Sequence, residues 1–112
     1  MRLLIFLIQL IIPTRRVTMD SKLHRDLLQV LKKDLPNNPT SSLRYQDNKA
    51  LVIQNIANNC IISSENGQSS FTYSSFSSNI VFEEGDLDDL AKELSKFTLK
   101  VDLYCSYLTI GW

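Results

Sequence analysis

CIISSENGQSSFTY (Cys60–Tyr73) is the stretch from which the fold of this chain is predicted. Asn66-Gly67 stands between two runs of alternating character, and this dipeptide is the strongest short-range signal for a β-hairpin. A two-residue turn at this point places Cys60 opposite Tyr73, on the face that also carries the other large apolar side chains. The stretch therefore predicts a hairpin with this face against the core.

The residues on either side of this stretch predict more of the same sheet. Upstream, the short runs Leu43–Tyr45 and Ala50–Ile53 flank Asp47-Asn48, a pair that tolerates the backbone of a tight turn. Downstream, the alternation changes phase between Tyr73 and Phe76, which predicts a bulge, a loop or an extra strand near Ser74–Ser78, and Asn79–Phe82 reads as one more short strand.

Two amphipathic helices are predicted outside this β-rich region. In Ser21–Leu35 apolar residues recur every three or four positions, with Asp20 as the N-cap and Pro36 as the stop. A second helix begins at Gly85-Asp86, carries an apolar stripe as far as Phe97, and has an acidic first turn that suits the helix dipole.

The last segment, Thr98–Trp112, is predicted to be a single strand that begins half-buried and ends apolar on both sides. The expected fold class is α+β: one small domain in which an antiparallel sheet of about five strands carries two helices on one face. The expected order of elements is α-β-β-β-β-α-β.

An apolar leader, residues 1–18, precedes the single domain predicted for residues 19–112. Its run Leu3–Ile12 would make a helix about 15 Å long, half the thickness of a bilayer core, so no transmembrane span is expected. Arg15 and Arg16 follow that run where a signal peptide would need a small-residue cleavage site. We therefore expect the leader to be dispensable or a non-native start, with Met19 as the true initiator.

The sequence contains no pattern typical of a catalytic, metal or cofactor site. Cys60 and Cys105 lack the spacing of a metal site, and His24, the single histidine, lies at the edge of an apolar helix face. Three glycines cannot build a phosphate-binding loop, and the acidic residues of 83–89 lack the alternation of a calcium loop. We therefore expect a non-enzyme without metal or cofactor; a hydrolase using Ser or Cys with His24 is the weakest alternative.

The net charge of the predicted domain limits the kind of molecule that it can bind. Three of the twelve basic residues lie within the leader, which leaves nine against twelve acidic ones. A net negative domain does not suit binding to nucleic acid, which needs clustered Lys and Arg.

The apolar end of the last strand suggests a binding surface for another protein or for a second copy in a homodimer. The residues expected to form it are Tyr104, Leu108, Ile110 and Trp112. The sequence thus predicts a small cytoplasmic interaction module, comparable with inhibitors, immunity proteins, antitoxins or chaperones. The alternative is a secreted protein in which the leader is a signal peptide and Cys60 forms a disulfide with Cys105.

Overall fold

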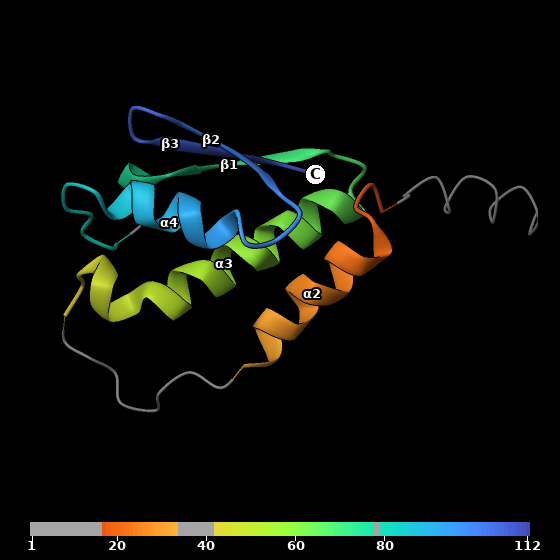
Figure 1. Ribbon diagram of the computed structural model, residues 1–112, viewed down its shortest axis with the longest axis horizontal. Helices are drawn as coiled ribbons and strands as arrows, with labels where there is room; N and C mark the ends of the chain where they lie inside the picture. The colour runs from red at the N-terminus through yellow and green to blue at the C-terminus, as the bar shows by residue number, and fades with distance from the viewer. Residues whose placement is uncertain (1–16, 34–41, 78) are drawn as a thin grey trace, which may run out of the picture.

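A computed structural model describes residues 17–33, 42–77 and 79–112 of the chain (Figure 1). The elements are α2 (Ser21–Lys32), α3 (Tyr45–Glu65), β1 (Ser70–Ser74), the 3-10 turn η2 (Ser75–Ser77), α4 (Asp86–Leu94), β2 (Lys100–Tyr104) and β3 (Tyr107–Gly111). The three strands form one antiparallel sheet in the order β1-β3-β2. In Figure 1 helices α3 and α4 lie beneath the sheet, and α2 packs against α3.

The fold is a small α+β domain with an antiparallel sheet, but the prediction of about five strands and two helices is wrong. Within the described ranges the structure has three α-helices and three strands. The expected order of elements fails with it, because two predicted β segments are helical and one predicted strand is a hairpin.

Helix α3 accounts for the largest error. It begins at Tyr45 and runs to Glu65, through the second strand of the first predicted hairpin and the first strand of the next. Val52, Ile56 and Cys60 are buried along one side, at the four-residue spacing of a helix. Cys60 therefore lies on a helix beneath the sheet and is not paired with Tyr73.

Asn66-Gly67 ends this helix instead of turning a hairpin. The N–H of Asn66 donates to the carbonyl of Ile62 (3.1 Å), and the N–H of Gly67 donates to that of Ser64 (3.0 Å). Gly67 has φ +81°, the left-handed conformation that commonly follows a helix. The same positive φ favours Asn-Gly in hairpin turns, so the dipeptide fits both structures.

Helices α2 and α4 lie where the periodicity predicts them. Asp20 caps α2 by accepting the N–H of Lys22 (3.2 Å). The helix ends at Lys32, where the backbone of Lys33 is extended, earlier than the predicted Leu35; Leu35 and Pro36 themselves fall outside the described residues. At the start of α4 the carboxylate of Asp86 accepts the N–H of Glu83 (2.8 Å), while the N–H of Asp86 donates to the carbonyl of Glu83 (3.1 Å). This reciprocal pair satisfies backbone groups at the helix start.

The segment predicted as one last strand is a hairpin. Strands β2 and β3 are joined by a two-residue turn at Cys105-Ser106, where Cys105 has φ +53°. Neither turn residue is Gly, Asn or Asp, so the usual hairpin signal is missing. Asn79–Phe82 is not a strand either, since it contributes one isolated parallel bridge between Val81 and Arg44.

The core lies between the inner face of the sheet and helices α3 and α4. It includes Leu108 and Ile110 from the centre of β3, and Ile56 and Leu90 from the helices. No helix in the described part of the chain is long and apolar enough to cross a membrane.

Candidate functional site

The structure separates the four residues predicted to bind a partner. Leu108 and Ile110 are fully buried, because on the central strand they point toward the helices. Trp112 is partly buried, and its Nε1 donates to Oγ1 of Thr18 (2.7 Å). Tyr104 is 77% exposed. Of the four, only Tyr104 presents most of its surface to solvent.

Two further exposed aromatic residues lie at the same end of the sheet as Tyr104. Tyr107 lies directly opposite it across the β2–β3 pair and is 48% exposed. The N–H of Ser75 donates to the carbonyl of Ser106 (3.1 Å), which brings Phe76, 78% exposed, next to the hairpin turn. We call Phe76, Tyr104 and Tyr107 the aromatic end of the sheet.

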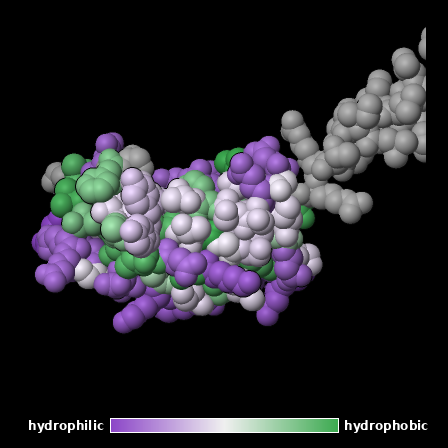
Figure 2. Space-filling model, turned by 90° about the horizontal axis from the view of Figure 1, so that it is seen from above, coloured by the Kyte–Doolittle hydropathy of each residue, from purple (hydrophilic) through white to green (hydrophobic). Residues whose placement is uncertain are grey.

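Figure 2 looks down on the sheet from the side opposite the helices. Hydrophobic residues gather at the left end of this view, where the hairpin turn and η2 lie in Figure 1. The middle of the face is pale, since its outward residues are mainly small and hydroxylated: Ser70, Thr72, Ser74 and Thr109. The end of the sheet at the hairpin turn and η2 is therefore more hydrophobic than the rest of this face, which also carries Lys100 and Asp102 of β2.

Sequence reasoning missed Tyr107 and Phe76. In a single strand over Thr98–Trp112, Tyr107 would lie on the same face as Leu103. The turn at Cys105-Ser106 instead reverses the chain and brings Tyr107 beside Tyr104. Phe76 falls in the segment where a bulge, a loop or an extra strand was predicted, and it lies in the 3-10 turn η2. The sequence feature that could have indicated this turn is the pair of small residues, Cys105 and Ser106, between two tyrosines.

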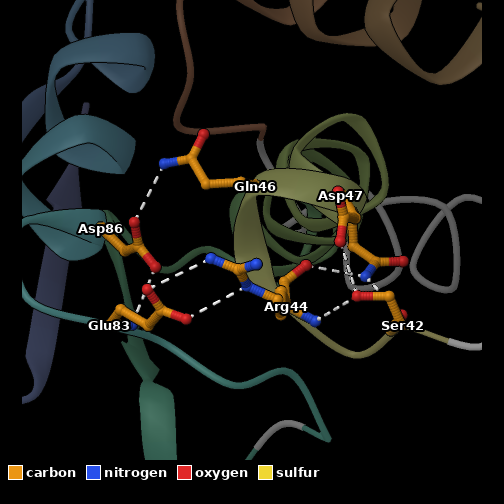
Figure 3. Close-up of polar contacts among 7 residues, drawn as sticks. Ser42, Arg44, Gln46, Asp47, Glu83 and Asp86 are labelled. Atoms are coloured by element: carbon orange, nitrogen blue, oxygen red, sulfur yellow. Dashed lines mark hydrogen bonds and ion pairs between the residues drawn. The ribbon is translucent and has the colours of Figure 1, made fainter.

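The acidic residues near α4 join that helix to the start of α3 (Figure 3). Arg44 contacts Glu83 through two atom pairs, Nε to Oε1 at 3.1 Å and a guanidinium NH₂ to Oε2 at 3.4 Å. Gln46 donates from Nε2 to Asp86 (3.0 Å). Within the described ranges no group of three His, Cys, Asp or Glu side chains is arranged to hold a metal ion.

A second polar cluster links the first two turns of α3 to α4. The hydroxyl of Tyr45 donates to Asp89 (2.9 Å), and Nζ of Lys49 lies 2.9 Å from Asp89 and 3.3 Å from Glu93. The hydrogen bonds from Lys49 and Tyr45 lower the pKa of Asp89, and burial, followed by the contact with Asp89, raises the pKa of Tyr45. These contacts stabilise the charged carboxylate of Asp89 and the neutral phenol of Tyr45, and they link α3 to α4.

The two thiols lie in contrasting places. Cys60 is fully buried in α3, and burial raises the pKa of its thiol to about 12. Cys105 is exposed in the hairpin turn. Both are free, so the disulfide of the secreted alternative is not formed. His24 has its Nε2 buried without a hydrogen-bond partner among the described residues.

A cleft of about 390 Å³ lies between α2, α3 and α4. Val30, Ile53 and Phe97 contribute apolar walls, and Glu93 on its rim is already paired with Lys96 (3.0 Å). The aromatic end is the stronger candidate, because its three large side chains project from the domain. Comparison with protein-family models, curated proteins and solved structures finds no match for this chain.

Proposed function

We propose that this protein is a small non-enzymatic interaction module that binds another protein through the aromatic end of its sheet. The observation that carries the proposal is the exposure of Phe76 and Tyr104, each more than three-quarters accessible, beside Tyr107. Burying one aromatic side chain removes roughly 150–250 Å² from water, and aromatic residues dominate the binding energy of protein interfaces. The next residue along β3, Leu108, points to the opposite face of the sheet and is fully buried, which anchors this end of the strand in the core.

The chemistry of the site indicates what kind of partner fits. Phe76 offers only apolar surface, whereas the two tyrosines combine an aromatic ring with a hydroxyl that can donate a hydrogen bond. The residues next to them at the turn, Cys105 and Ser106, are small. We infer a partner with an apolar patch and hydrogen-bond acceptors at its rim.

The test compares protein capture by the immobilised full chain with capture by two variants. Phe76→Ser/Tyr104→Ser removes the exposed rings, while Leu51→Ser changes a residue of α3 that is 47% exposed and lies on another element. Circular dichroism establishes that all three proteins are folded.

We expect the captured partner to bind the Leu51→Ser protein as it binds the unchanged chain. The aromatic variant should lose about thirtyfold in affinity, the effect of removing an interface hot spot. Equal binding by all three proteins, or equal loss in both variants, would contradict the proposal.

A further inference from the structure

Strand β2 is an open edge of the sheet. In the order β1-β3-β2 it pairs with β3 alone among the described strands. Its residues are exposed at every position except Val101, and even Leu103, which points to the helix side, is 37% exposed. Exposed edge strands with apolar residues are templates for pairing with another chain.

The hairpin turn fixes which backbone groups this edge presents. Tyr104 and Tyr107 flank a two-residue turn, so they form a hydrogen-bonded pair within the hairpin. Alternation along the strand then directs the N–H and C=O groups of Val101 and Leu103 away from β3. These groups are available to a new strand.

We propose that a second copy of this chain adds to β2 edge to edge, so that two β2 strands pair antiparallel around a two-fold axis at Val101. This inference goes beyond the proposed function, since it concerns the edge of β2 and names a second copy of the chain as the partner. In this register Lys100 of each copy lies opposite Asp102 of the other, on the outer face. Leu103 lies opposite Leu99 of the other copy, on the inner face.

The charges of Lys100 and Asp102 favour this register over the two registers that are shifted by two residues. Moving one strand by two residues keeps the hydrogen-bonding pattern but places Asp102 opposite Asp102, or Lys100 opposite Lys100. Like charges directly opposite one another destabilise an antiparallel pair, whereas opposite charges stabilise it. The Val101 register forms two ion pairs and joins the two sheets into one.

The test measures the association of the full chain by sedimentation equilibrium. We expect the unchanged chain to form a dimer, and Lys100→Asp or Asp102→Lys to weaken dimerisation about tenfold or more, because two attractive pairs become repulsive. The double variant Lys100→Asp/Asp102→Lys should restore the dimer, since it exchanges the charges within each pair.

A monomeric unchanged chain, or a dimer that both single reversals leave intact, would overturn this inference. The outcome is separable from that of the proposed function. Phe76→Ser changes a residue outside β2 and should leave dimerisation unchanged while it weakens capture of the other partner. If the chain is monomeric yet still loses its partner on Phe76→Ser, only the pairing of two β2 strands is wrong.

Discussion

Single residues determine the backbone where α3 ends. Gly67 has φ +81°, and a Cβ added there would have no atom within 4 Å, so the requirement for glycine is conformational and not steric. Residues with a Cβ adopt this conformation at a cost of about 1–2 kcal/mol. A substitution at Gly67 therefore measures the energetic cost of the backbone conformation without a change in packing.

We predict that Gly67→Ala lowers the free energy of unfolding by about 1 kcal/mol, measured by urea denaturation. Gly111→Ala is the control. Gly111 lies in β3, and an added Cβ would meet Ser69 and Lys100 only at ordinary contact distances of 3.8–4.0 Å. The control should be neutral or slightly stabilising; a greater loss at Gly111 than at Gly67 would contradict this account.

At this scale the sequence predicts well whatever depends on local chemistry. Asp20 caps α2 as expected, whereas the N-cap of α4 is Gly85 without a side-chain hydrogen bond, and the carboxylate of Asp86 accepts the N–H of Glu83 ahead of the helix. Asn66-Gly67 was predicted to be a hairpin turn and is a helix end, because local chemistry does not distinguish the two. Tyr104 was predicted as exposed contact surface, whereas its neighbour Tyr107 depends on a turn without a typical turn residue.

Among the elements, α3 shows why the secondary-structure preferences of its residues led to the wrong prediction. It contains β-branched residues and several asparagines, all poor helix formers, and it contacts α2, α4 and β1. Burial on several sides removes the one-sided apolar stripe that identifies a helix in a sequence. Its conformation is therefore set by packing, whereas the stripes of α2 and α4 could be recognised directly.

Two substitutions of the exposed residue Asn58 test whether this segment is helical. In a helix Asn58→Ala should raise the free energy of unfolding by about 0.5 kcal/mol, and Asn58→Val should change it little, because Val and Asn have similar helix propensities. In a strand the order would be reversed, since Val favours strands and Ala does not. Chemical denaturation of the two variants decides between them.

The molecule as a whole depends on contacts between segments far apart in the sequence. Lys49 of α3 pairs with Asp89 and Glu93 of α4, and Trp112 at the C-terminus reaches Thr18 ahead of α2. Neither contact could be predicted, because both require the position of α3. Thr18, assigned to the leader, also donates to the carbonyl of Gln68, so this residue is joined to the domain.

The Lys49 contacts predict how stability responds to acid. Lys49 and Tyr45 lower the pKa of Asp89 below its ordinary 3.8, and Lys96 and Lys49 lower that of Glu93 below 4.5. A lowered carboxyl pKa contributes stability that is fully present above the unfolded-state value and is lost as the pH falls through the folded-state value. The free energy of unfolding should therefore decrease from about pH 5 to about pH 2.

Lys49→Met should flatten this decrease, since the two carboxyl groups then titrate closer to their unfolded-state values. The side chains of Lys49 and Asp89 are 32% and 35% exposed, so solvent weakens the pair and the difference at neutral pH should be about 1 kcal/mol or less. Lys22→Met, which removes an exposed lysine of α2, is the control and should keep the original slope. Equal slopes for Lys49→Met and the unchanged chain, from urea denaturation across this range, would show that Lys49 does not link the two helices.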